Sequence, residues 1–214
     1  MSELKYETRE VDNFNQISGF MDFKNEGDFY YIQLIKRKAE NPDMPKSQRL
    51  IKSYYVYNIE KYWDYEDEIK YLSYHTKSRA YIRLNVRNDK IIALQMLKRM
   101  AQRIADENYG FRKLYESICG EFHSAENKTW IIDIDEKDRV KNNIESINDV
   151  IEKINICRPA GNKVVTIIHT VSGRHIITHP FDMKDFKNKY PNIDVHKDNP
   201  TLLYCKFDKY VREF

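Results

Sequence analysis

The chain has 214 residues, of which 41% are hydrophobic and 32% are charged. This balance excludes a disordered chain, and the length is enough for one domain with a real core or for two apposed lobes. The net charge is only +3. Such a small excess argues against a chain that binds duplex nucleic acid tightly through electrostatics alone.

The cysteine pattern and the N-terminus bear on the cellular compartment. The three cysteines, Cys119, Cys157 and Cys205, lie far apart and form no CxxC pair, so the sequence indicates neither a zinc knuckle nor a disulfide framework. Scattered thiols suit a reducing compartment. The first residues lack the apolar core of a signal peptide, and no run of about 18 apolar residues occurs. We therefore expect a cytoplasmic protein with no membrane partner.

The first part of the chain predicts strands and one helix. Residues 1–27 are polar and predict a helix or an arm packed on the body. Aromatic and branched residues predict strands over 28–35 and 49–58, joined by an exposed loop with two prolines. A helix is expected over 62–72, and alternating apolar and polar residues predict a strand over 78–87.

A longer helix is expected next. Asn88 or Asp89 is placed to cap it, because a short side-chain oxygen accepts a free N–H of the first turn. Its packed face is predicted to consist of Ala93, Leu97, Met100, Ala101 and Ile104. Residues 107–128 are less regular and predict helical turns.

The second half shows the clearest patterns. KTWIIDIDE (128–136) predicts a strand, and apolar residues spaced four and three apart from Val140 to Ile154 predict one amphipathic helix. The rest predicts a strand over 163–171, a turn at SGR, a strand over 175–181, a helix over 182–190, and closing strands over 193–197 and 201–208. This order indicates an α+β fold with a mixed or antiparallel sheet and helices on one side.

Two aspartates form the first candidate site. Asp133 and Asp135 are two residues apart on a predicted strand, so their carboxylates project to the same face. Adjacent carboxylates repel each other unless a cation neutralises them, and hard oxygen ligands suit Mg²⁺ or Mn²⁺. The same pair also suits a strand end whose aspartates face water and cap the turn into the next helix.

The segment TVSGRH forms the second candidate. A turn at Ser172-Gly173-Arg174 followed by His175 would bring backbone N–H groups, a guanidinium and an imidazole together near a phosphate. A plain hairpin turn with a solvated histidine is the alternative. Further along the chain, either Asp194 or Asp198 could add a third carboxylate, with Lys197 available for phosphate.

The order of these motifs resembles the archaeo-eukaryotic primase superfamily. Its members carry a DxD on a strand, a small-x-His and a late apolar-Asp, which correspond here to WIIDID, SGRH and NID. The resemblance covers about residues 128–207. It implies an RRM-like catalytic unit over 128–214 and an N-terminal α/β accessory unit over 1–127, with one compact domain as the other possibility.

The resemblance also implies a function, namely template-directed nucleotidyl transfer in DNA replication. Asp133, Asp135 and Asp194 would hold two Mg²⁺ or Mn²⁺ ions. The phosphates of an incoming nucleoside triphosphate would be contacted by Ser172, Arg174, His175 and Lys197. A single-stranded template or a nucleotide would be held by Arg79, Arg83, Asn85 and Arg87, on the polar face of a predicted strand. A separate helicase is an expected partner.

Two other functions fit the same residues. The first is a different metal-dependent phosphoryl-transfer enzyme, such as a nuclease, which would share the DxD. The second is a non-catalytic nucleic-acid-binding or protein-binding module with a decayed site. This last alternative predicts that Asp133, Asp135 and His175 do not converge in space.

Overall fold

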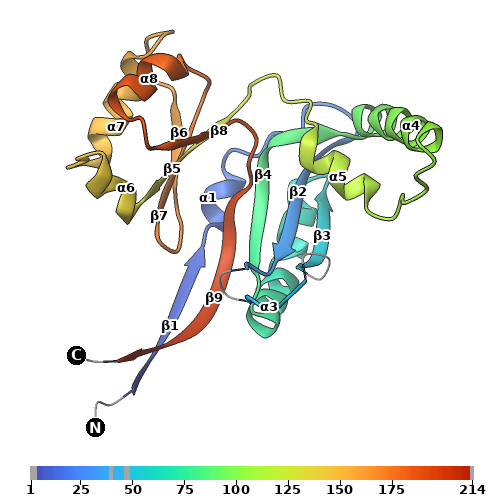
Figure 1. Cartoon of the computed structure of the whole chain (residues 1–214), viewed down its shortest axis with the longest axis horizontal. Helices are drawn as coiled ribbons and strands as arrows, with labels where there is room; N and C mark the ends of the chain where they lie inside the picture. The colour runs from blue at the N-terminus through green and yellow to red at the C-terminus, as the bar shows by residue number, and fades with distance from the viewer. Residues whose placement is uncertain (1–3, 39–40, 46–48, 213–214) are drawn as a thin grey trace. The chain divides into compact units, whose positions relative to one another are not determined.

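The computed structural model describes residues 4–38, 41–45 and 49–212, and its chain forms two compact α+β units (Figure 1). The first unit comprises Met1–Ala125 with Leu202–Phe214, and the second comprises Glu126–Thr201. None of the helices in the described part of the chain is long and apolar enough to cross a membrane.

The first unit is built on a five-stranded sheet. Its strands lie in the order β1 (Leu4–Asp12), β9 (Thr201–Arg212), β4 (Arg79–Asn88), β2 (Asp28–Ile35) and β3 (Leu50–Val56). β2 pairs antiparallel with β3 and β4, and β9 pairs antiparallel with all nine residues of β1. Figure 1 shows β1 and β9 side by side along their length.

The last strand changes the expected division of the chain. The sequence predicted that residues 202–214 belong to the second unit, whereas in the structure they belong to the first. The reason is that β9 inserts between β1 and β4, where Leu202, Leu203, Tyr204 and Cys205 are buried. β1 itself was not predicted, since its residues are mostly polar and charged.

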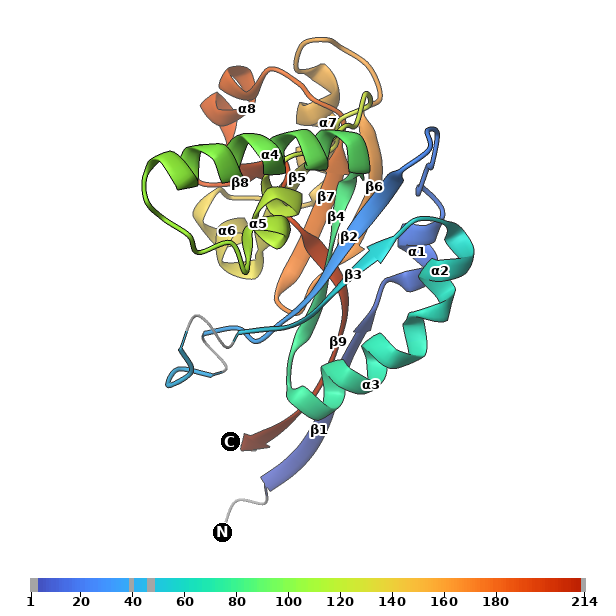
Figure 2. The ribbon, with the colours of Figure 1, turned by 90° about the vertical axis from the view of Figure 1, so that its right-hand side faces the viewer.

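Helices cover both faces of this sheet, as Figure 2 shows for α3 and α4. Phe29 and Tyr31 of β2 pack in one cluster with residues of α4 (Asp89–Ala105) and α5 (Leu114–Glu121). On the other face the ring of Tyr54 contacts the ring of Tyr65, which joins α2 (Ile59–Asp64) to α3 (Glu66–Thr76). The short α1 (Phe14–Ser18) contacts α2 through the rings of Phe14 and Tyr62.

Helix α4 packs through a different face from the one expected. Asn88 caps it as predicted, with its side chain accepting the N–H of Lys90 at 3.1 Å. However, its buried side consists of Ile92, with Met96 and Met100 packed beside it. Leu97 and Ile104 are 67% and 51% exposed. The prediction was correct for Met100 and wrong for the other four residues, because α4 carries apolar residues on more than one side and periodicity alone could not select the packed face.

The second unit holds a four-stranded antiparallel sheet. The strand order is β6 (Val164–His169), β7 (Gly173–Thr178), β5 (Trp130–Asp135) and β8 (Asp194–His196). The core cluster contains Ile132, Ile134 and Ile176 from the strands together with residues of α7 (Ile147–Ile156) and α8 (Met183–Lys189). Because side chains alternate along a strand, Asp133 and Asp135 point to the opposite face.

The helix after β5 is interrupted. Instead of one helix up to Ile154, the chain forms α6 (Glu136–Lys141) and then α7, with Asn143 between them at a φ of 50°. Ser146 caps α7 by accepting the N–H of Asn148 at 3.1 Å. The apolar spacing continues across the break because Ile144 is itself buried in the core cluster.

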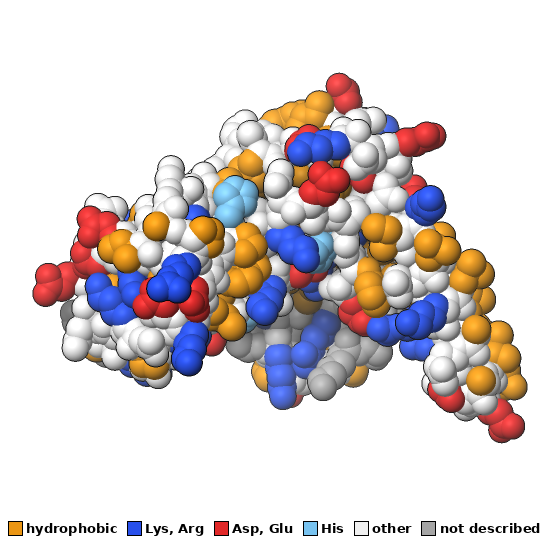
Figure 3. Space-filling model, turned by 90° about the horizontal axis from the view of Figure 1, so that it is seen from above, with side chains coloured by type: hydrophobic (Ala, Val, Ile, Leu, Met, Phe, Trp, Pro, Cys, Tyr) orange, Lys and Arg blue, Asp and Glu red, His pale blue; other side chains and the backbone are white. Residues whose placement is uncertain are grey.

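Surface charge is mixed in sign. On the face drawn in Figure 3, basic and acidic side chains are interspersed. This agrees with the small net charge of +3. Any phosphate recognition on this face therefore depends on particular side chains rather than on a uniform basic field.

Candidate metal and nucleotide site

Three residues from the three sequence motifs lie in register across the sheet of the second unit. Asp133 on β5 lies directly opposite His175 on β7 and opposite Asp194 on β8. Residues directly opposite in an antiparallel sheet project to the same face, with Cβ atoms about 4.5–5.5 Å apart. His175 and Asp194, which lie 42 and 61 positions after Asp133 in the sequence, thus form one row of side chains with it on the face opposite the core cluster.

The best-defined contact in this row joins Asp133 and His175. Nε2 of His175 lies 3.4 Å from Oδ1 of Asp133, and their side chains are 14% and 35% exposed. Burial alone would raise the pKa of Asp133. The hydrogen bond from His175 and the positive charges of His175, His196 and Lys137 outweigh this effect, so the pKa of Asp133 lies below its ordinary value. Asp133 is therefore an ionised carboxylate at neutral pH.

Asp135 lies two residues further along the same face, at the end of β5. Oγ of Ser172 donates a hydrogen bond to its carboxylate at 2.7 Å, and Nζ of Lys137 lies 3.5 Å from it. Asp135 also precedes α6, and its backbone N–H donates to the carboxylate of Asp138. Asp135 thus lies on the same face as Asp133. It also occupies the N-cap position of α6, as predicted by the alternative in which the aspartates cap the turn into the next helix.

The structure separates the two candidates for the third carboxylate. Asp194 is exposed and lies in register with Asp133, whereas Asp198 follows the end of β8. Lys197 does not extend toward the aspartates, because its ammonium lies over the ring of Trp130, 5.4 Å from the ring centre. Trp130 packs against the core cluster, on the opposite face of the sheet.

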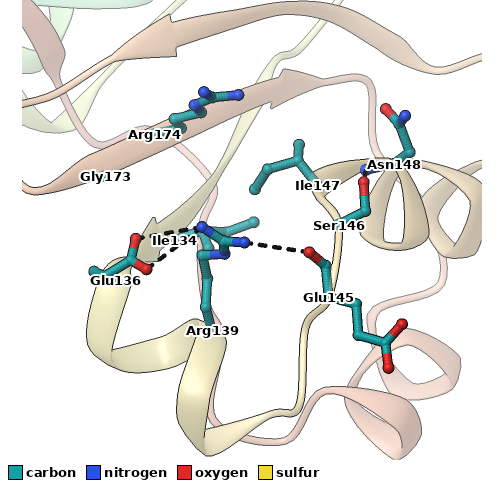
Figure 4. A pocket seen from close by; sticks show the side chains of 9 residues that line it. All are labelled: Ile134, Glu136, Arg139, Glu145, Ser146, Ile147, Asn148, Gly173 and Arg174. Carbon is teal, nitrogen blue, oxygen red and sulfur yellow. Dashed lines mark hydrogen bonds and ion pairs between the residues drawn. The ribbon is translucent and has the colours of Figure 1, made fainter.

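Arg174 and His175 point away from each other. The sequence placed Gly173 and Arg174 in a turn, but both belong to β7, so consecutive side chains alternate between the faces. Arg174 lines a pocket of about 380 Å³ on the helix side, together with Ile134, Arg139 and Ser146 (Figure 4). The expected convergence of Arg174 with His175 on one phosphate is therefore wrong.

The other residues of this pocket limit its charge. Arg139 forms ion pairs with Glu136 at 3.4 Å and donates to the backbone carbonyl of Glu145 at 3.2 Å, as the dashed lines in Figure 4 show. Glu145 and Glu136 both line the pocket. Two arginines and two glutamates thus leave it with no excess of positive charge.

The arginines expected to hold a template belong to β4 of the first unit. Arg79, Asn85 and Arg87 are buried, so the prediction of an open polar face is wrong for these three. Arg79 lies over the ring of Phe207, and the guanidinium of Arg87 donates to the carbonyl of Cys119. Arg83 is half-buried beside Gly120 of α5. Packing of α5 over this strand and pairing with β9 beside it explain the burial.

Two further residues lie near the aspartates, His196 and Thr201, and neither was predicted from the sequence. His196 lies two positions after Asp194 on β8, and its charge lowers the pKa of Asp133. Because side chains alternate along a strand, the position two residues after Asp194 could have been predicted to lie on the same face. Thr201 lies 2.8 Å from Nδ1 of His175 through its hydroxyl. Nothing in the sequence indicated this contact, because it joins residues 26 positions apart.

The donor atoms on this face of the sheet suit a hard divalent ion. Asp133 and Asp135 offer carboxylate oxygens on one face, and Mg²⁺ is commonly held by one or two carboxylates together with waters and substrate phosphates. Within the described residues, no three His, Cys, Asp or Glu side chains are arranged to hold an ion by themselves. The chemistry of the two aspartates therefore fits an ion that shares its coordination with a phosphate ligand.

Comparisons with known proteins give no match. No family model matches the chain, and neither a curated protein nor a solved structure does. The resemblance to primases therefore stays a prediction that rests on the motifs.

Proposed function

We propose that the second unit is the catalytic core of a primase-polymerase-like nucleotidyltransferase that makes or extends a nucleic-acid primer. The observation that carries this proposal is the register of β5 with its two neighbours, in which Asp133 faces both His175 and Asp194. A module with a decayed site gives no reason for the DxD, the histidine and the late aspartate to lie in one row.

The topology supports the finer description of this unit as RRM-like. Its elements follow the order strand, helices, strand, strand, helix, strand. If the strands are numbered along the chain, their spatial order is 2-3-1-4, so each helical connection joins two strands that have another strand between them. This is the arrangement of split βαβ folds, and RRM domains likewise use a four-stranded sheet with an open face.

In the proposed reaction, the 3′-hydroxyl of a primer or first nucleotide attacks the α-phosphorus of an incoming nucleoside triphosphate. A new P–O bond forms, the bond between the α-phosphorus and the oxygen that bridges to the β-phosphate breaks, pyrophosphate leaves, and the hydroxyl proton is released to solvent. Asp133 and Asp135, with Asp194, would hold Mg²⁺ or Mn²⁺. When bound, these ions polarise the phosphate and lower the pKa of the attacking hydroxyl.

The side chains themselves have three roles in this proposal. The low pKa of Asp133 keeps its carboxylate charged, as a metal ligand must be. His175 supplies a ring N–H beside the carboxylates, where phosphate oxygens would lie. Ser172 holds the carboxylate of Asp135 through its 2.7 Å hydrogen bond. The partners are nucleoside triphosphates and a single-stranded template, and a separate helicase would expose that template.

A primer-synthesis assay tests the proposal. The wild type and Asp133→Asn/Asp135→Asn are incubated with single-stranded template, with and without primer, and with ribo- or deoxynucleoside triphosphates plus Mn²⁺ or Mg²⁺. We expect products in the wild type and none in the double variant. Shortening of the template without synthesis would favour the nuclease alternative. No reaction by the wild type under any of these conditions would overturn the proposal.

A further inference from the structure

The imidazole of His175 is held at both of its nitrogens. Nε2 lies 3.4 Å from Oδ1 of Asp133, and Nδ1 lies 2.8 Å from Oγ1 of Thr201. Thr201 is fully buried, and the side chain of His175 is 14% exposed. The ring therefore has one carboxylate neighbour and one hydroxyl neighbour, in surroundings from which water is largely excluded.

These two neighbours determine where the proton of a neutral imidazole lies. An ionised carboxylate only accepts hydrogen bonds, so the contact with Asp133 favours the tautomer that carries the proton on Nε2 but does not fix it alone. Nδ1 then presents a lone pair, and a buried lone pair needs a donor. The hydroxyl of Thr201 is the group that contacts Nδ1, and a hydroxyl can donate.

We propose that Thr201 is a positioning residue that holds His175 with its proton on Nε2, directed toward the row formed by Asp133 and Asp194. In this state His175 presents an N–H to that row, whereas the other tautomer would present a lone pair that repels carboxylate and phosphate oxygens alike. The use of this N–H on a nucleotide phosphate rests on the proposed function. The tautomer itself does not.

Long-range proton–nitrogen NMR of the histidine ring tests the tautomer directly. Spectra are recorded at increasing alkaline pH until the ring signals no longer change, so that the neutral ring is observed. We expect Nε2 of His175 to be protonated and Nδ1 unprotonated in the wild type. Thr201→Ser, which keeps the hydroxyl, should retain this pattern, and Thr201→Val should shift both nitrogens toward a mixture of tautomers. Protonated Nδ1 in the wild type would overturn the proposal even if Thr201→Val failed to fold.

Thr178→Val is the matched control. Thr178 is also fully buried on the same unit, and its hydroxyl donates to the carbonyl of Lys163 at 3.0 Å. It lies three residues from His175 on β7, so its side chain points to the other face. Its loss should leave the nitrogen signals of His175 unchanged. An equal shift in Thr178→Val and Thr201→Val would mean general loosening of the unit and would overturn the specific role of Thr201.

A second measurement connects the tautomer to nucleotide binding. If the proposed function holds, Thr201→Val should weaken Mn²⁺-dependent triphosphate binding by about 5- to 10-fold, the equivalent of one hydrogen bond, while Thr201→Ser should bind like the wild type. Unchanged affinity in Thr201→Val would refute the positioning role. If the wild type binds no nucleotide, the proposed function fails, and the NMR pattern still decides the inference about Thr201.

Discussion

The close approach of β5 and β7 depends on a residue without a side chain. Gly173 lies directly opposite Asp135 in the register of these strands. A Cβ at this position would overlap the carbonyl oxygen of Ile134 and would lie 2.8 Å from Cα of Asp135. Both atoms belong to the backbone, so no rotation of a side chain could relieve the overlap.

We therefore expect Gly173→Ala to separate the ends of β5 and β7. Overpacking of this kind costs about 1–3 kcal/mol or more, and it would also disturb the hydrogen bond from Ser172 to Asp135. Denaturant unfolding measures the loss of stability. Gly19→Ala is the control, because a Cβ there would lie at an ordinary 3.6 Å from the carbonyl oxygen of Gln16. Equal stability of the two variants would contradict the packing described.

At the scale of elements, the strands that form the site were predictable from the sequence. The residues at which they begin, and therefore the face on which each side chain lies, were only partly predictable. The alternation in WIIDID correctly gave the face of Asp133 and Asp135, because one side of the strand must be buried. The same rule separates Arg174 from His175, but it applies only when β7 is known to begin at Gly173. The break between α6 and α7 was missed because Ile144 continues the apolar spacing through a loop.

An ion pair joins two of the helices that cover the second sheet. Nζ of Lys153 on α7 lies 2.7 Å from Oδ1 of Asp185 on α8. The hydrogen bonds from Lys153 and from the thiol of Cys157 hold the pKa of Asp185 below its ordinary value. A carboxyl with a depressed folded-state pKa adds stability above its unfolded pKa of about 3.9, and this contribution is lost as the pH falls through the folded-state pKa.

Asp185→Asn should therefore be less stable than the wild type near pH 6, and the difference should shrink as the pH is lowered below about 4. Denaturant unfolding of both proteins across this range measures the effect. Glu152→Gln, at an exposed position on α7, provides a control for the loss of one surface charge. A difference between wild type and Asp185→Asn that stays constant down to the lowest pH would contradict the assignment.

At the scale of the whole molecule, the first unit is made from both ends of the chain. Residues 1–125 form most of it, and β9 completes its sheet after the chain has formed the second unit. The sequence did not predict that β9 belongs to the first unit, because its residues indicate a strand but do not indicate which strands it pairs with. Such a long-range pairing depends on the tertiary structure rather than on local propensity.

Leu203 tests this discontinuous arrangement. It is fully buried on β9, so Leu203→Ala should cost about 2–5 kcal/mol. Hydrogen exchange should show the amides of β1 losing protection together with those of β9, because the two strands pair along their length. Leu97→Ala, at an exposed position, should change stability by less than about 0.5 kcal/mol. Full protection of β1 in Leu203→Ala would contradict the pairing.

The proposed function places Asp133 in a metal-dependent nucleotide site. Calorimetric titration of a nucleoside triphosphate into the protein, with and without Mn²⁺, tests it most directly in the wild type, in Asp133→Asn and in Glu152→Gln as the charge-matched control. We predict Mn²⁺-dependent binding in the wild type and in Glu152→Gln, and binding at least about tenfold weaker in Asp133→Asn. Binding that is independent of Mn²⁺, or equally tight in Asp133→Asn, would contradict the account.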